Sequence, residues 1–356
     1  MDIKLLKRIA STPGIPGFEQ EIRSLVLSET ESFCDSVSID IMGNLTVKKG
    51  NGNKKVMIAA HMDEIGLLST HVDDHGFIRF HTLGGFDPRT LFAQRVTVLG
   101  KNKLPGVIGG KPAHVLTDEE KKKAPSVDDM FIDTGLPAEK VKELVPVGTP
   151  VVRDRTCMKM GDLISGKSLD NRLSVYCLIE ILKHVRVPKD ISFYAVFTVQ
   201  EEVGLRGVRV ASESIKPDVG LAMDITIAND IPGVSAQKKI TELGKGPAVK
   251  IMDGSVISSP SLVQYIEDIA EQSDLSIQRE VLTSGGTDTP AMQYLTGIGA
   301  HVSCISIPTR YVHSTVESSH SRDIEDTITL TTNLISHINT FFDQSDVENA
   351  IDNRLI

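Results

Sequence analysis

The sequence of 356 residues lacks several features that would place a protein in a class at once. It has no tryptophan, and aromatic residues make up only 4% of the chain. No apolar run approaches the ~20 residues that a membrane span needs, and the first residues lack the apolar core of a signal peptide. The four cysteines are far apart and form no CxxC pair, so they predict neither a disulfide framework nor a zinc cluster. We therefore expect a soluble, cytoplasmic protein without a membrane partner.

The chain also lacks an excess of positive charge. It has 38 Lys and Arg residues against 47 Asp and Glu residues, which gives a formal net charge of -9. The one tight basic run, residues 121–123, directly follows three acidic residues. A solvated helix face with paired charges explains that run well. A nucleic-acid partner is not expected, because such proteins usually carry a basic stripe.

The chain is long enough for two domains, since a domain typically has ~150 residues. A chain of this length can bury a sizeable core without a metal or a disulfide. We therefore expect any metal site to serve function rather than folding.

Two kinds of sequence pattern alternate along the chain. Residues 55–60, 191–199 and 219–223 are short apolar runs typical of strands buried on both faces, and residues 37–47 alternate like strands around a turn at 43–44. Between 70 and 163, glycine, proline and short alternating segments predict a β-rich insert. We therefore expect a mixed α/β fold, with a mostly parallel sheet flanked by helices. Its catalytic domain would comprise 1–69 and 164–356, with 70–163 as an inserted domain. The expected helices are 18–33, 170–185, 260–273 and 322–343.

Polar side chains follow three of the predicted strands. His61 and Asp63 come after the first, Glu201 and Glu202 after the second, and Asp224 after the third. Ligands bind in open α/β sheets at this edge, beyond the carboxyl ends of the strands. Two further candidates are Asp170, at a helix start, and His313, in a loop.

Each of these residues alone has an ordinary explanation. Asp170 makes a good helix N-cap, and a single histidine is usually a satisfied polar residue. Together, however, they concentrate negative charge at buried strand ends, which is costly without a counter-ion. Imidazole and carboxylate ligands suit zinc, cobalt or manganese better than calcium.

Several motifs give these residues a family resemblance. The segments AHMDEIG, SGKSLDNR, VQEEVGLRG and SGGTD, together with Asp224 and His313, resemble the M42 family of dinuclear metallo-aminopeptidases over nearly the whole chain. The insert lies between His61 and Asp170, as it does in M42, and 109 positions separate these two residues. In the related M20 and M28 peptidases this first interval is short.

The resemblance implies a role for each residue. Asp170 should bridge two divalent metal ions, with His61 and Asp224 completing one site and Glu202 and His313 the other. Zinc or cobalt is expected first, and manganese also fits. Two further residues are expected to act without binding a metal, Glu201 as the general base and Asp63 as the residue that holds the His61 imidazole.

The resemblance further implies removal of N-terminal residues from short peptides, by attack of a metal-activated water whose proton Glu201 accepts. Gly285, Gly286 and Thr287 could line the substrate cleft, although an ordinary turn explains them equally well. The insert should be a dimerisation domain, and dimers should assemble into a tetrahedral dodecamer. The sequence does not indicate which N-terminal residue of the substrate is preferred.

Alternatives remain open at this point. A deacylase or carboxypeptidase of the same clan would use the same metals. A glucanase needs two carboxyl groups on opposite sides of one bond, whereas Glu201 and Glu202 are neighbours. It would also leave the histidines without a role, and the chain has few aromatic side chains on which a sugar could stack. A binding protein that has kept the fold is a third alternative.

Overall fold

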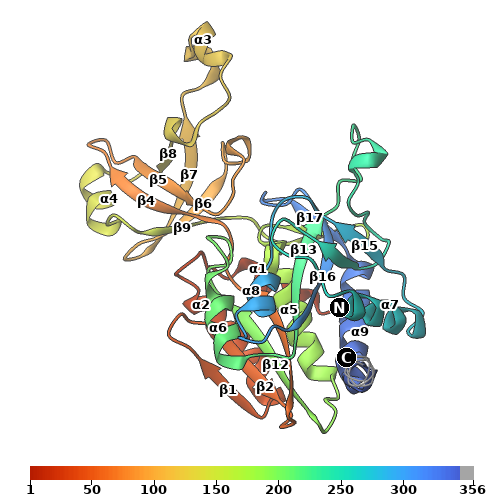
Figure 1. Cartoon of the computed structure of the whole chain (residues 1–356). Helices are drawn as coiled ribbons and strands as arrows, with labels where there is room; N and C mark the ends of the chain where they lie inside the picture. The colour runs from red at the N-terminus through yellow and green to blue at the C-terminus, as the bar shows by residue number, and fades with distance from the viewer. Residues whose placement is uncertain (345–356) are drawn as a thin grey trace.

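The fold is that of a computed structural model, which describes residues 1–344. A large mixed sheet has four parallel strands at its centre, in the order β12-β3-β13-β16 (Figure 1). These strands are β3 (Lys54–His61), β12 (Ile191–Thr198), β13 (Val219–Ile227) and β16 (His301–Arg310). The pattern confirms the predicted mixed α/β class with a parallel centre.

Antiparallel strands extend the sheet at both sides. On one side these are β1 (Ser36–Ile39) and β2 (Leu45–Lys49). On the other side they are β17 (Glu317–His320), β11 (Leu163–Gly166) and β10 (Met158–Met160). Two further strands branch from β16, namely β14 (Ala248–Met252) and β15 (Gln278–Val281).

Helices cover both faces of the sheet, which explains why the central strands are mostly apolar. Because side chains alternate along β3, Val56 and Ile58 join one core cluster while Met57 and Ala59 join the other. The first core lies under α1 (Ile3–Ser11), α2 (Gln20–Thr30), α5 (Leu169–His184), α7 (Pro260–Gln272) and α9 (Ser321–Ser336). The second lies under α6 (Arg206–Ile215) and α8 (Thr289–Tyr294).

Six strands form a separate, closed antiparallel barrel with a core of its own. They are β4 (Gly66–Val72), β5 (Ile78–Leu83), β6 (Arg95–Leu99), β7 (Lys103–Gly110), β8 (Met130–Asp133) and β9 (Pro150–Arg153). The barrel strands span 66–153, a shorter range than the 70–163 expected for the insert. The reason is that β10 pairs with β11, and β11 pairs with β17 of the large sheet.

Residues 111–129 leave the barrel between β7 and β8 and project as an arm, with the short helix α3 (Asp118–Lys121) at its tip (Figure 1). None of these residues is buried. A last short helix of the barrel is α4 (Ala138–Leu144). Among residues 1–344, no helix is both long and apolar enough to cross a membrane.

Two predicted elements differ in extent. The helix expected over 322–343 is interrupted, because α9 ends at Ser336 and a turn at His337 precedes further helical residues. The strand expected over 219–223 continues to Ile227, so Asp224 lies within β13. Pairing of β13 with β3 nevertheless stops at Ala222, so Asp224 lies beyond the part of β13 that pairs with β3, although it still pairs with β16.

Candidate metal centre

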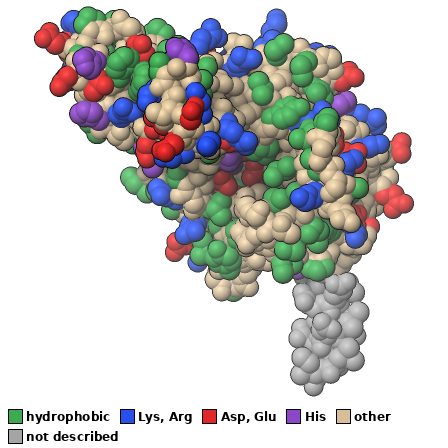
Figure 2. Space-filling view, turned by 90° about the horizontal axis from the view of Figure 1, so that it is seen from above, with side chains coloured by type: hydrophobic (Ala, Val, Ile, Leu, Met, Phe, Trp, Pro, Cys, Tyr) green, Lys and Arg blue, Asp and Glu red, His purple; other side chains and the backbone are tan. Residues whose placement is uncertain are grey.

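The predicted residues meet at the carboxyl ends of the central strands. A cleft of about 510 Å³ opens there, and it is lined by His61, Asp170, Glu201, Glu202, Asp224 and His313. The surface seen from above is hollowed between the barrel and the larger body, and acidic side chains lie within the hollow (Figure 2). The cleft lining also includes Gly285, Gly286 and Thr287, where the sequence left a lining role open against a simple turn.

Two groups of side chains could each hold a metal ion, and Asp170 belongs to both. One Asp170 oxygen lies 3.3 Å from His61 Nε2, and the other lies 3.2 Å from His313 Nε2. Asp224 Oδ1 is 3.8 Å from His61 Nε2, and Glu202 Oε2 is 3.5 Å from His313 Nε2. The first group is therefore His61, Asp170 and Asp224, and the second is Asp170, Glu202 and His313.

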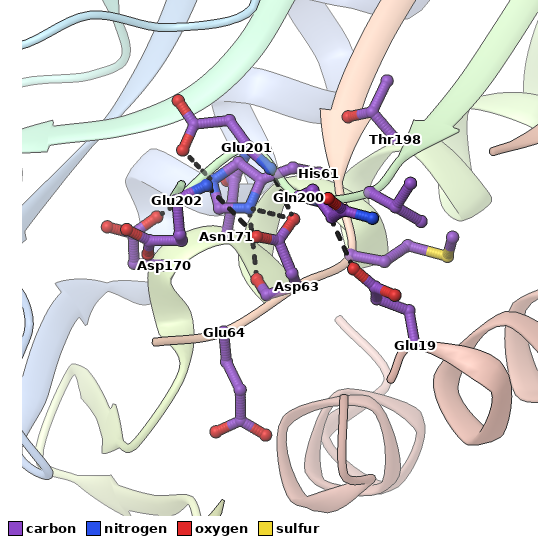
Figure 3. Close-up of polar contacts among 12 residues, drawn as sticks. Glu19, His61, Asp63, Glu64, Asp170, Asn171, Thr198, Gln200, Glu201 and Glu202 are labelled. Carbon is purple, nitrogen blue, oxygen red and sulfur yellow. Dashed lines mark hydrogen bonds and ion pairs between the residues drawn. The ribbon is translucent and has the colours of Figure 1, made fainter. Parts of the chain in front are cut away.

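Glu201 belongs to neither group but lies beside the first. Its Oε2 is 3.8 Å from His61 Nε2 (Figure 3). The charge of Asp288, which accepts a hydrogen bond of 2.6 Å from the Thr198 hydroxyl, helps to raise the pKa of Glu201. Glu201 can therefore exchange a proton with a molecule in the cleft without occupying a ligand position.

Asp63 organises both strand ends. His61 Nδ1 lies 3.1 Å from the backbone carbonyl of Asp63 and 3.5 Å from its carboxylate. The carboxylate instead accepts hydrogen bonds from the backbone N–H groups of Glu201, at 3.0 Å, and Glu202, at 3.1 Å (Figure 3). One residue thus sets the orientation of the imidazole through its backbone and the position of the two glutamates through its side chain.

Glu19 is a supporting residue that sequence reasoning missed. It precedes α2, is 2% exposed, and accepts hydrogen bonds from the backbone N–H of Gly17 and of Gln200. Gln200 has a φ of +54°, which is uncommon for a residue other than glycine. Glu19 therefore holds the strained residue directly before the two glutamates of the cleft.

The start of α5 is held by a second set of contacts that the sequence did not reveal. Glu317 on β17 accepts a 3.0 Å hydrogen bond from the backbone N–H of Asp170. Deeper in the core, the Lys167 ammonium donates to the Glu64 carboxylate at 2.6 Å, and Glu64 also accepts from Ser168. Glu64 carried a signal through its place in the AHMDEIG motif, and Lys167 and Ser168 through theirs in SGKSLDNR. Glu317 lies in a segment with no recognisable pattern.

The carboxyl groups of the cleft repel one another in a buried environment. Burial raises the pKa of Glu201 and of Glu202 well above the ordinary value, and neighbouring carboxylates add to the rise. Burial likewise raises the pKa of Asp224 to about 8. Asp170 is the exception, because its hydrogen bonds to His313 and His61 outweigh burial and lower its pKa.

This electrostatic pattern fits a site for divalent cations. Several buried carboxyl groups lack enough positive charge around them, and Glu202 Oε1 is buried with no hydrogen-bond partner among residues 1–344. Two imidazoles and three carboxylates form the mixed nitrogen and oxygen donor set that zinc, cobalt and manganese accept. The arrangement can therefore hold cations and keep one further carboxyl group, that of Glu201, free for proton transfer.

Comparisons with known proteins agree with the fold. A family model described as M42 glutamyl aminopeptidase matches residues 43–330. The lysyl aminopeptidase of Pyrococcus furiosus is 35% identical, and the match covers 95% of this chain and 98% of that protein.

Solved structures extend the likeness to three dimensions. An aminopeptidase from the archaeon Desulfurococcus kamchatkensis is 38% identical, with a TM-score of 0.89 and coverage of 94% of each chain. The TET1 peptidase of Pyrococcus horikoshii, described as assembling into a tetrahedron or a large octahedral shell, is 34% identical. Its TM-score is 0.84, and the match covers 94% of this chain and 99% of that one. The chain therefore belongs to the M42 family of aminopeptidases.

Proposed function

We propose that this aminopeptidase uses two divalent metal ions bound through a shared Asp170. His61 and Asp224 would complete one site, and Glu202 and His313 would complete the other. The observation that carries the proposal is that the two Asp170 oxygens point to different histidines, each next to a further carboxylate. Zinc or cobalt is our first expectation, and manganese also suits these ligands.

Residues of the chain would have separate roles in catalysis. Bound metal ions would lower the pKa of a water molecule and polarise the scissile carbonyl group. Glu201 lies beside the first ligand group, and its carboxylate would accept the proton of the attacking water and deliver it to the leaving amine. Asp63 would keep Glu201 and Glu202 in place through their backbone N–H groups.

The cleft also suits a substrate with a free amino terminus. The free α-amino group of a peptide would bind beside one of the two ligand groups, which would restrict attack to the first peptide bond. Gly285 and Gly286 would allow the peptide backbone to approach closely, because they have no side chain beyond the backbone. An N-acylated substrate, which a deacylase would take, lacks that free amino group. A glucanase would use neither of the two histidines.

The test is hydrolysis of a short peptide with a free amino terminus beside its N-acetylated twin. Both reactions are run after chelation and again after zinc or cobalt has been restored. We expect cleavage of the free peptide only, one residue at a time from the amino end, and only with metal present. A panel of first residues would then define the substrate preference.

Other results would contradict the proposal in different ways. Preferred cleavage of the acetylated twin would indicate a deacylase or an endopeptidase with the same metal site. Activity that survives chelation would remove the metals from the mechanism and return attention to a glucanase. Bound metal without any hydrolysis would favour a binding protein.

We also propose that the chain is a homo-oligomer in which dimers form a tetrahedral dodecamer. The shell described for the TET1 relative supports this proposal. The barrel, an inserted domain in sequence, would supply contacts between subunits, while residues before and after it form the catalytic domain. Short peptides are the proposed substrates, and a cytoplasmic location stays a prediction.

A further inference from the structure

A buried arginine of the barrel contacts the loop that carries the candidate metal ligand His313. Arg153 lies at the end of β9, is 2% exposed, and donates a 3.2 Å hydrogen bond to the backbone carbonyl of His313. Its guanidinium lies 5.4 Å from the ring centre of Phe86, another residue of the inserted segment. A side chain from the barrel thus binds the backbone of a candidate metal ligand that lies 160 positions later in the chain.

The loop that carries His313 needs such a contact. His313 has a φ of +62° and Tyr311 a φ of +59°, both in the left-handed region that residues other than glycine rarely adopt. Thr315, in the same loop, donates a second hydrogen bond to Gln94 of the barrel segment, at 3.3 Å. The loop conformation is therefore supported from the barrel at two points.

The barrel also approaches the same ligand group from β5. A Cβ atom added at Gly84 would lie 3.2 Å from Glu202 Oε2, and one added at Gly85 would lie 3.2 Å from His313 Nδ1. Both distances are at the tight end of ordinary contacts. The segment after β5 therefore packs directly against the two ligands that complete the second group, and glycine leaves the room they need.

The first group is supported differently. His61 is held by the carbonyl of Asp63, and Asp224 lies in β13, whose backbone is paired along its length with β16. These supports belong to the large sheet. The two halves of the centre thus depend on different parts of the fold, although they share Asp170.

We infer that Arg153 is a positioning residue for the His313 and Glu202 half of the centre, so that the second metal ion depends on the barrel. This inference rests on the proposed two-metal function. Residues that orient metal ligands from outside typically change metal affinity by about 10- to 100-fold when they are removed. Loss of Arg153 should therefore weaken the binding of one metal ion and leave the other nearly unchanged.

The experiment is a titration of metal-free protein with Zn²⁺, with bound metal counted by elemental analysis after equilibrium dialysis. The wild type should bind about two ions, and Arg153→Met should bind about one at a free Zn²⁺ concentration that fills the wild type. Arg153→Lys should recover part of the affinity, because an ammonium group can still donate to a carbonyl. Gly85→Ala should weaken the same ion more mildly, by pressing on His313 without removing a buried charge.

The matched control is Arg79→Met, which removes another barrel arginine that donates to backbone carbonyls, those of Asp128 and Met130, and stacks on a phenylalanine. It should keep both ions. A second check uses Asp224→Asn, which should bind only the ion of the second group. Adding Arg153→Met to that variant should then remove the remaining ion.

The outcomes separate the inference from the proposed function. Two ions bound with unchanged affinity in Arg153→Met would overturn the inference and leave the two-metal proposal standing. The inference would also be overturned if Arg153→Met and Gly85→Ala weakened the binding of both metal ions equally. A wild type that binds no Zn²⁺ would overturn the two-metal proposal and this inference with it.

Discussion

Glu201 and Glu202 are adjacent in sequence but have different surroundings. Glu202 Oε2 lies 3.5 Å from His313 within the second ligand group, whereas Glu201 lies near His61 and belongs to neither group. The turn that contains them is held by Asp63, which accepts from both backbone N–H groups. The two carboxyl groups can therefore be tested separately, since a change in one leaves the backbone of the other in place.

We expect Glu201→Gln to keep both metal ions and to lower kcat by about 10²- to 10⁴-fold, because an amide cannot accept the proton of the attacking water. Elemental analysis and peptide hydrolysis on the same sample would check both halves of this prediction. Glu202→Gln serves as the control, since it should lose metal as well as activity. A fully active Glu201→Gln enzyme would remove Glu201 from the role of base.

Glu19 should make stability depend on pH. Burial, with some help from Asp63, raises its pKa from 4.5 to about 7 in the folded chain. The folded state then holds more protons than the unfolded state, so the contribution of Glu19 to stability is lost as pH rises from about 4.5 to 7.

The Glu19→Gln variant does not lose stability in this way as pH rises. Its amide oxygen can still accept hydrogen bonds from the backbone N–H groups of Gly17 and Gln200. We expect the stability of the variant relative to wild type to increase by up to ~3 kcal/mol between pH 4.5 and 8. Urea unfolding of both metal-free proteins at these two pH values would measure the difference. A constant difference would show that Glu19 titrates alike in the folded and unfolded chain.

Single residues were predictable where chemistry leaves a pattern in the sequence. The seven candidate residues lie at strand ends, at a helix start or in a loop, and six of them line the cleft while Asp63 contacts it from behind through His61, Glu201 and Glu202. Glu19, Glu317 and Arg153 were not predictable, because each acts through a backbone group far away in the chain. Their partners are Gln200, Asp170 and His313.

At the scale of elements, β14 and β15 carry a buried ion pair close to the cleft. The Lys250 ammonium donates to Glu280 at 2.5 Å, and both side chains are at most 1% exposed. We expect Lys250→Met to lower the free energy of unfolding by about 3–5 kcal/mol, because it leaves the Glu280 carboxylate buried and unpaired. The double variant Lys250→Met/Glu280→Gln should recover part of that loss.

Urea unfolding at constant metal content would measure these differences. Lys239→Met is the matched control, since Lys239 pairs with Glu242 on the surface, and its loss should cost less than about 1 kcal/mol. Equal effects of Lys250→Met and Lys239→Met would mean that burial of the Lys250 pair has no energetic consequence.

Burial made three of the four central strands predictable, but not β16, whose buried segment is interrupted by Ser303, Ser306 and Pro308. The central strands β3, β12 and β13 appear as apolar runs because helices cover both faces of the sheet. In contrast, β10 is exposed along its whole length and joins the sheet only through β11. Its side chains carry no burial pattern, so the sequence assigned it to the insert. The end of β13 was placed too early because Asp224 interrupts the apolar run.

At the scale of the whole molecule, the barrel and its arm project from the larger body (Figure 1). Several apolar side chains of the inserted segment are exposed, among them Phe92 at 42%, Val107 at 48% and Val115 at 52%. A single subunit gains nothing from such exposure, because burial of apolar surface is what stabilises a fold. Contacts with further copies of the chain would cover these residues.

We therefore expect sedimentation at a mass that is a multiple of 38.7 kDa, with twelve subunits in the complete particle. In a closed shell the clefts would face substrates only after passage through an opening. A short peptide and a folded protein that begin with the same residues should then differ strongly in cleavage rate, because the folded protein cannot enter. A monomer at working concentration, cleaving both substrates at similar rates, would contradict the assembly while leaving the chemistry of the cleft unchanged.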